Sequence, residues 1–160
     1  MQRILVICVG KLKERFYIEA AAEYQKRLSR FCKLEVVELP EVRLPDSPSP
    51  AQIEQALKKE AEAIRGKLPP ASSIVALCIE GQTRSSEELA QLLADWAQRG
   101  EKCLAFVIGS SFGLHPSIKS EAWVRLSMSP MTFPHHLARV MLLEQIYRGF
   151  QINEGSKYHK

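Results

Sequence analysis

The sequence lacks the short motifs that assign metal, nucleotide or redox chemistry directly. It has no CxxC pair, no Cys/His spacing of a zinc site, no Walker A motif and no GxGxxG fingerprint. Its cysteines are isolated, and three of them lie in or beside apolar runs, as small buried thiols do: Cys8, Cys78 and Cys103. We therefore expect reduced structural cysteines and no metal site, and the binding of a dinucleotide or of ATP phosphates is poorly supported.

Long hydrophobic runs are also missing. No stretch approaches the length that spans a bilayer, and the apolar run 4–9 is too short for a signal sequence. We therefore expect a cytoplasmic protein with no membrane partner. The 22 basic and 18 acidic residues give a net charge of +4, which is too small to indicate a nucleic-acid partner by itself. The 160 residues, 46% of them apolar, are expected to form one domain, 1–160, with its own core.

Strand and helix patterns alternate along the whole chain. The wholly apolar run 103–108 is typical of a central parallel strand, whereas the four prolines between residues 40 and 50 require a loop. The expected strands are 3–9, 33–39, 74–79, 103–108 and 124–127, and the expected helices are 13–30, 51–66, 85–99, 116–121 and 135–150. This order predicts an α/β fold, with a mostly parallel sheet and helices on both faces.

Ligands of such sheets bind at the carboxyl ends of the strands, so the loops after residues 79, 108 and 127 are the candidate site. Glycines in the loop 109–113 allow positive φ and close approach of a ligand, although a plain strand-to-helix turn explains them as well. The segment 128–134 is apolar but holds two prolines, so it cannot be regular structure. It is suited to wrap an adenine ring, or it is a connection that crosses the core without a ligand.

The C-terminal helix has more apolar residues than one stripe needs, which is expected if one face packs in its own domain and another in a partner subunit. It carries Arg148, and the polar tail after it carries Tyr158 and His159. Arginine binds phosphate and aromatic rings stack on bases, which favours a role in RNA binding. A disordered, idle tail is the alternative. Glu54, Glu60 and Glu62 lie on an apparently solvated helix, and no chemistry is assigned to them.

Several blocks of the sequence are similar to a known family. They are residues 7–13, 80–82, 85–87, 106–109, 126–127, 131–135, 144–148 and 158–160. On these blocks the chain resembles, over its whole length, the SPOUT-class methyltransferases and specifically the RlmH family, which methylates N3 of a pseudouridine in large-subunit (23S) ribosomal RNA. The blocks 131–135 and 144–148 are the most specific, because they are long, ungapped and at the expected separation.

The resemblance implies a SPOUT-type fold with a deep trefoil knot in the C-terminal half, a homodimer, and S-adenosyl-L-methionine as cofactor. By position, the cofactor contacts fall on Leu77, Gly109, Met128, Ser129, Pro130, Met131, Thr132 and Phe133. The family usually has a second glycine where this chain has Ser110, and serine there costs about 1 kcal/mol if positive φ is required.

The resemblance also implies catalytic roles for the C-terminal residues. His159 is the candidate base or proton relay, Tyr158 positions or stacks on the base, and Arg148 holds a phosphate or stabilises the imide anion. The expected substrate is the assembled ribosome, because the chain has little net charge and no separate RNA-binding module. The alternatives are a non-catalytic ribosome-associated binding protein of the same fold and, less well supported, a flavodoxin-like or nucleotide-binding regulator.

Overall fold

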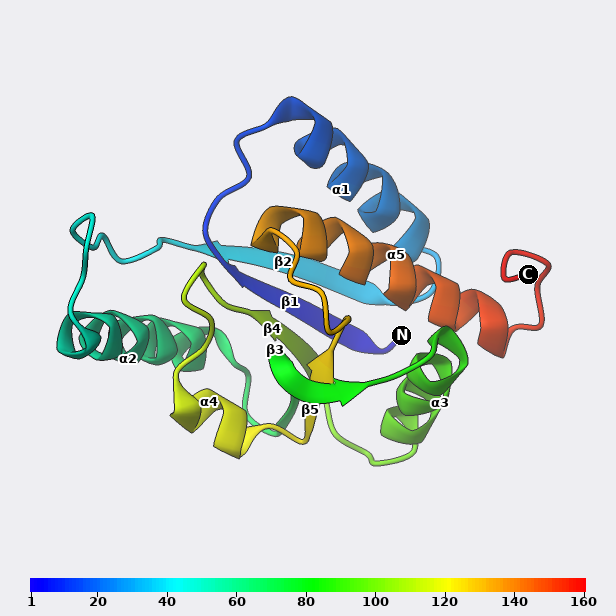
Figure 1. Ribbon diagram of the computed structural model, residues 1–160. Coiled ribbons are helices and arrows are strands. Elements are labelled where there is room, and N and C mark those ends of the chain that lie inside the picture. The colour runs from blue at the N-terminus through cyan, green and yellow to red at the C-terminus, as the bar shows by residue number, and fades with distance from the viewer.

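The computed structural model describes residues 1–160 and shows strands and helices in strict alternation (Figure 1). The strands are β1 (Arg3–Val9), β2 (Lys33–Leu39), β3 (Ser72–Thr83), β4 (Cys103–Ile108) and β5 (Val124–Ser127). The helices are α1 (Arg15–Leu28), α2 (Pro50–Lys67), α3 (Ser86–Ala97), α4 (Pro116–Glu121) and α5 (His135–Asn153). None of these helices combines the length and the apolar character needed to cross a membrane.

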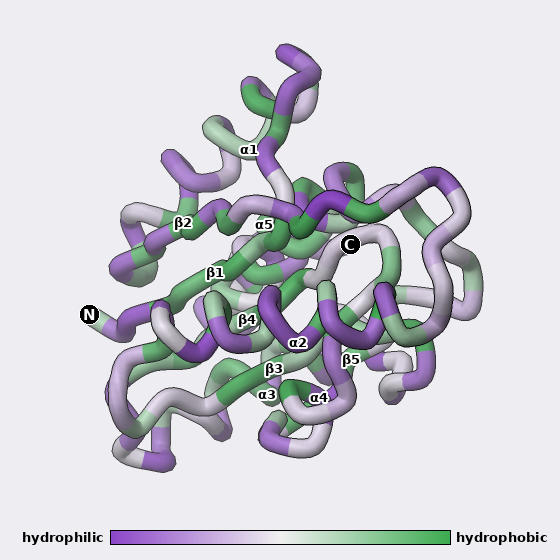
Figure 2. Tube along the Cα trace, turned by 90° about the vertical axis from the view of Figure 1, so that its left-hand side faces the viewer, coloured by the Kyte–Doolittle hydropathy of each residue, from purple (hydrophilic) through white to green (hydrophobic).

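The five strands form one sheet in the order β2-β1-β4-β3-β5, and every neighbouring pair is parallel. The predicted parallel sheet is therefore confirmed, with no antiparallel strand. β1 and β4 lie in the interior of the sheet and are buried almost throughout, which explains their continuous apolar runs. Figure 2 shows this hydrophobic centre, with hydrophilic residues concentrated on α2 and the outer loops.

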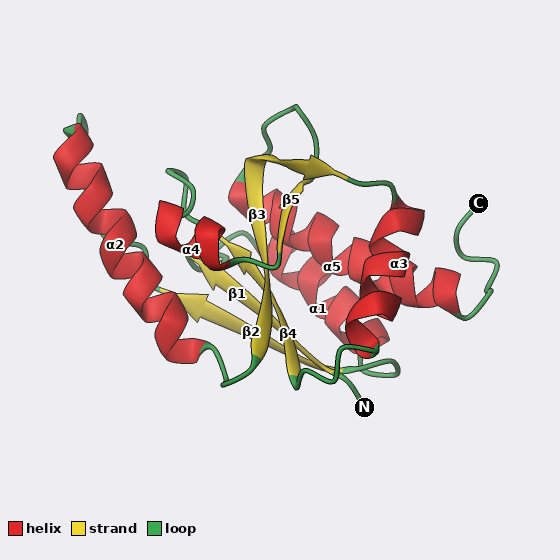
Figure 3. Cartoon of the chain, turned by 90° about the horizontal axis from the view of Figure 1, so that it is seen from below, coloured by secondary structure: helices red, strands yellow, loops and turns green.

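Helices cover both faces of the sheet, as predicted (Figure 3). Alternate residues of β1 point to opposite faces, because successive side chains of a strand do so. Ile4, Val6 and Cys8 pack in one core cluster with α1, α3 and α5. Leu5 and Ile7 pack in a second cluster with α2 and α4. The sheet thus separates two cores, and its carboxyl edge lies between the two helical layers.

β3 is longer than the predicted strand 74–79. It pairs with β5 before and after a register shift between Leu77 and Gln82, so the residues between them bow around β5. Gly81 permits this bend, because a Cβ there would lie 2.8 Å from the carbonyl oxygen of Arg125. The sequence analysis missed this extension of the strand, because the polar residues Glu80 and Gln82 follow the apolar run. The trefoil knot stays a prediction.

A buried arginine on α5 joins the helix to the far side of the sheet. Arg139 is 2% exposed, and its guanidinium donates to a carboxylate oxygen of Glu38 at 2.5 Å and to the carbonyl oxygen of Gly10 at 2.8 Å. Glu38 also accepts from the amide of Leu12 at 2.9 Å. Burial tends to raise the pKa of Glu38, but these bonds and the charge of Arg139 outweigh it and hold that pKa below its usual range. The carboxylate therefore fixes the end of β2, the loop after β1 and the start of α5.

Candidate functional site

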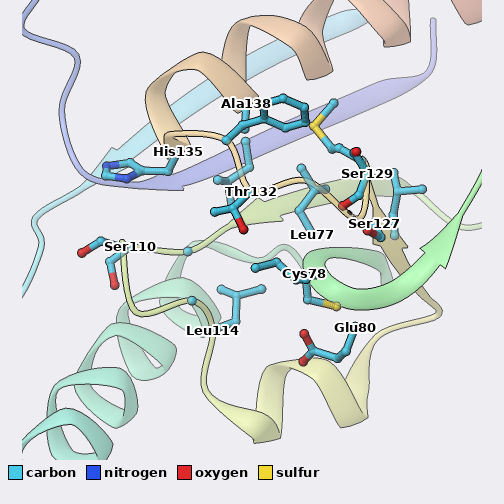
Figure 4. Close-up of a pocket in the computed structure, with 18 of the residues that line it drawn as sticks. Leu77, Cys78, Glu80, Ser110, Leu114, Ser127, Ser129, Thr132, His135 and Ala138 are labelled. Atoms are coloured by element: carbon cyan, nitrogen blue, oxygen red, sulfur yellow. Dashed lines mark hydrogen bonds between the residues drawn. The ribbon is translucent and has the colours of Figure 1, made fainter.

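A cavity of about 640 Å³ lies at the carboxyl edge of the sheet, where β3, β4 and β5 end (Figure 4). Its walls come from the bowed part of β3 and from the loops after β4 and β5. Leu77 and Glu80 line it from β3, Ser110 and Leu114 from the loop before α4, and Thr132 from the loop before α5. The sequence analysis placed the site at this edge correctly, but the segment after residue 79 continues β3 and does not form the predicted loop.

The segment between β5 and α5 provides the irregular, mostly apolar wall. Within residues 128–133 the amide of Met131 donates to the Ser129 hydroxyl at 3.0 Å, and no other amide of this stretch donates a hydrogen bond inside the chain. Unpaired amides beside an apolar surface are suited to a flat heterocycle with a polar edge. Of the cofactor positions that the resemblance implies, Leu77, Gly109, Met128, Ser129, Met131, Thr132 and Phe133 line the cavity, and Pro130 does not.

The glycine loop after β4 owes its shape to two glycines with different functions. Gly113 has φ of +86°, a conformation that costs little only for glycine. Gly109 has no positive φ, but a Cβ on it would overlap the carbonyl group of Gly113. Ser110 also has no positive φ, so the strain considered for serine at this position does not arise.

The hydrogen-bond partner of Ser110 is Glu60, which the sequence analysis placed on a solvated helix face. The Ser110 hydroxyl donates to a carboxylate oxygen of Glu60 at 3.0 Å, and Glu60 on α2 is only 5% exposed. Glu60 is therefore not part of a solvated face. Its spacing of four residues from Ala56 and from Ile64, both buried, was the signal that places it on the buried stripe. Burial raises the pKa of the Glu60 carboxyl.

The C-terminal residues form a second cluster on α5 and the tail. The guanidinium of Arg148 donates to Glu144 at 2.5 and 2.9 Å and lies 4.8 Å from the centre of the Tyr158 ring. The Tyr158 hydroxyl donates to the same carboxylate at 3.2 Å. Burial and the charge of Glu144 raise the pKa of the Tyr158 phenol, so it remains protonated at neutral pH. Tyr158 is thus suited to stack or donate, and not to accept a proton.

His159 completes the cluster, and its two ring nitrogens have different partners. Nδ1 lies 3.2 Å from the Arg148 guanidinium, which can only donate, so Nδ1 is an acceptor. Nε2 therefore carries the proton and donates to Glu87 at 2.8 Å. In this structure the tail lies against α5 and α3 through these hydrogen bonds. Arg148, Tyr158 and His159 do come together, but none of them lines the cavity of their own chain.

The electrostatic features around the cavity are modest. An ion pair between Lys119 on α4 and Glu80 on β3 lies at its wall, and it lowers the pKa of Glu80. His135 also lines the cavity, and burial together with the nearby His136 lowers its pKa. Nowhere in the chain do three His, Cys, Asp or Glu residues gather as metal ligands do. The cavity therefore offers mainly shape, apolar surface and backbone groups to a ligand.

Comparison with known proteins identifies the family of the chain. A family model described as "Predicted SPOUT methyltransferase" matches residues 2–159. The chain therefore belongs to the SPOUT methyltransferase family.

Its relatives identify the branch of that family. "Ribosomal RNA large subunit methyltransferase H" of Streptococcus equi subsp. zooepidemicus (strain MGCS10565) is 46% identical over 99% of both chains. The protein of the same name from Streptococcus suis (strain 05ZYH33) is 47% identical over the same share of each. That of Ligilactobacillus salivarius (strain UCC118) is 46% identical over 98% of this chain and 99% of its own. The chain is thus a member of the RlmH family that the sequence motifs indicated.

A solved structure supports the fold independently. "The structure of a probable methylase family protein from Haemophilus influenzae Rd KW20" covers 99% of this chain and 71% of its own, with a TM-score of 0.54 and 15% identity. At this identity the likeness concerns the fold alone.

The glycine loop yields a prediction about stability. Gly109→Ala should lower the free energy of unfolding by about 1–3 kcal/mol, because the added methyl group overlaps the Gly113 carbonyl. Gly66→Ala is the matched control, since Gly66 lies in α2 with no atom within 4 Å of the new Cβ, and it should leave stability unchanged or slightly higher. Urea denaturation of both variants provides the comparison. Equal stability of the two would contradict the close approach described for Gly109.

Proposed function

We propose that the chain transfers a methyl group from S-adenosyl-L-methionine to N3 of a pseudouridine in large-subunit ribosomal RNA, on the assembled ribosome. The observation that carries the proposal is the cavity at the carboxyl edge of β3, β4 and β5, in a chain of this family. The printed name of its relatives gives the substrate class, ribosomal RNA of the large subunit. The nucleoside and the atom come from the resemblance of the sequence motifs.

The cavity fits the methyl donor by size and chemistry. A volume near 640 Å³ is within the range of sites for molecules of this size. Leu77, Met128 and Phe133 offer apolar surface for the adenine ring, and the unpaired amides of residues 128–133 are available to its polar edge. The close approach at Gly109 leaves backbone, rather than side chain, facing the bound molecule.

Methyl transfer to an imide nitrogen requires the loss of one proton from N3 and in-line placement of the two reactants. The methyl donor, when bound, supplies a sulfonium whose carbon–sulfur bond breaks toward sulfur. We propose Nδ1 of His159 as the proton acceptor, because Nε2 already carries a proton. Arg148 donates to the same Nδ1 in this structure, so this bond must break before Nδ1 accepts the proton. The released guanidinium is then suited to hold the imide anion, while Tyr158 stacks on the base.

The separation of the two clusters supports a homodimer with shared sites. Arg148, Tyr158 and His159 lie together at the C-terminal end of α5, whereas the cavity lies at its N-terminal end beside His135 and Ala138. We propose that the tail of one protomer completes the cavity of its partner. We extend the proposal to a trefoil knot in the C-terminal half, which the wrapping of β3 around β5 supports.

A ribosomal substrate explains the weak net charge. A chain with +4 overall releases few counterions on free RNA, so recognition of an assembled surface is more effective than attraction to any phosphate backbone. Ribosomes are met in the cytoplasm, which is the location we propose for the chain.

Transfer of labelled methyl from S-adenosyl-L-methionine to ribosomes that lack the modification tests the reaction directly. We expect label on N3 of one large-subunit pseudouridine, and much less label on free ribosomal RNA. Cofactor binding without any transfer would contradict the proposal and favour a non-catalytic ribosome-associated protein. Equal rates on short unstructured RNA and on ribosomes would contradict the ribosomal substrate.

Mixed dimers test the sharing of sites. His159→Ala alone should lower the single-turnover rate by about 100-fold, as loss of a general base does. Thr132→Arg, at an exposed position of the cavity wall, should block cofactor binding. In a heterodimer, the intact tail of the Thr132→Arg chain completes the intact cavity of the His159→Ala chain. One of the two sites is then complete, and activity should return to a substantial fraction of wild type. Mixed dimers that stay as inactive as the parents, with both variants folded, would show that each chain uses its own tail.

A further inference from the structure

Helix α2 reaches the glycine loop of the cavity through one buried side chain. The carboxylate of Glu60 accepts hydrogen bonds from the Ser110 hydroxyl and from the amide of Val42, each at 3.0 Å. Ser110 and Glu60 are 6% and 5% exposed, so neither bond is readily replaced by water. The two oxygens of one carboxylate therefore join α2, the segment after β2 and the wall of the cavity.

A second, solvent-exposed carboxylate contacts the same loop. Glu41, next to Val42, accepts from the hydroxyl of Ser111 at 3.3 Å. Two successive serines of the glycine loop thus bind two carboxylates, one on α2 and one after β2. Ser110 and Ser111 both line the cavity, whereas Glu60 and Glu41 stand behind it.

The carboxylate at position 60 is an exception on the buried face of α2. The other buried residues of α2 are apolar, and they pack against the sheet: Ala56, Ala61 and Ile64. Burial raises the pKa of Glu60, and the charge of Glu41 adds to this, so the ionised form is less favourable here than in water. An apolar residue of similar volume would avoid that cost, but it would leave the Ser110 hydroxyl and the Val42 amide without an acceptor.

We propose that Glu60 is a positioning residue of the methyl-donor site, which holds the glycine loop through Ser110 in the shape that binds S-adenosyl-L-methionine. This role rests on the proposed function. Glu60 does not touch the cavity itself and acts only through the loop. Without it, the loop 109–113 keeps its internal bond from the Gly113 amide to the Ser110 carbonyl but loses its attachment to α2.

Three variants separate this role from a simply structural one. Glu60→Met keeps the volume but leaves the Ser110 hydroxyl and the Val42 amide without their acceptor, so the melting temperature should fall, and the dissociation constant for S-adenosyl-L-methionine should increase about tenfold. Glu60→Gln can still accept from Val42 and bond to Ser110, and its dissociation constant should stay within about twofold of wild type. Ala61→Gly, the next residue of α2, should lower the melting temperature without weakening cofactor binding.

Calorimetric titration of the dimeric protein with S-adenosyl-L-methionine gives the dissociation constants. Hydrogen exchange of residues 109–113 in the ligand-free protein gives a readout independent of activity, and it should be faster in Glu60→Met only. Wild-type affinity in Glu60→Met, or a loss that follows stability equally in Ala61→Gly, would overturn the positioning role alone. Absence of cofactor binding by the wild-type protein would overturn the proposed function, and the role with it.

Discussion

The common direction of the five strands is the constraint on which the candidate site depends. Because every pair in the order β2-β1-β4-β3-β5 is parallel, all carboxyl ends meet at one edge, and each strand must be followed by a crossover. The cavity forms where the last three of these strands end. β5 has only four residues, and its double pairing with β3 holds it in the sheet. The pairing with β3 therefore fixes where the segment before β5 ends and where the segment 128–134 after it begins.

Helix α5 connects the two parts of the proposed chemistry. Its first turn borders the cavity through His135 and Ala138, and Arg139 fixes that end to Glu38 and to the loop after β1. Its later turns carry Glu144 and Arg148, which gather Tyr158 and His159 from the tail. Directly after Arg148, Gly149 allows close packing on α3, because a Cβ there would lie 2.7 Å from a methyl carbon of Leu93. One helix thus sets the distance between the cavity and the C-terminal cluster, which is why the proposal invokes a second protomer.

The features that follow local rules were predictable from the sequence. The apolar runs gave β1 and β4 with their bounds, the strand–helix alternation gave the parallel sheet, and the topology gave the edge of the sheet where the cavity lies. The features that depend on contacts between distant residues were not predictable in this way. The polar end of β3 pairs with β5, and the tail lies against α5 and α3 through hydrogen bonds to Glu144 and Glu87. Glu60 was missed because its partner Ser110 lies fifty residues away, on another element.

The bowed part of β3 and the loops after β4 and β5 are proposed to form one binding site for the methyl donor. Hydrogen exchange of the backbone with and without S-adenosyl-L-methionine tests it most directly, because it reports each loop separately. The account predicts protection of residues 77–80, 109–113 and 127–135 together, with little change in α1 or at the amino ends of the strands. Protection confined to one loop, or centred away from this edge of the sheet, would contradict it.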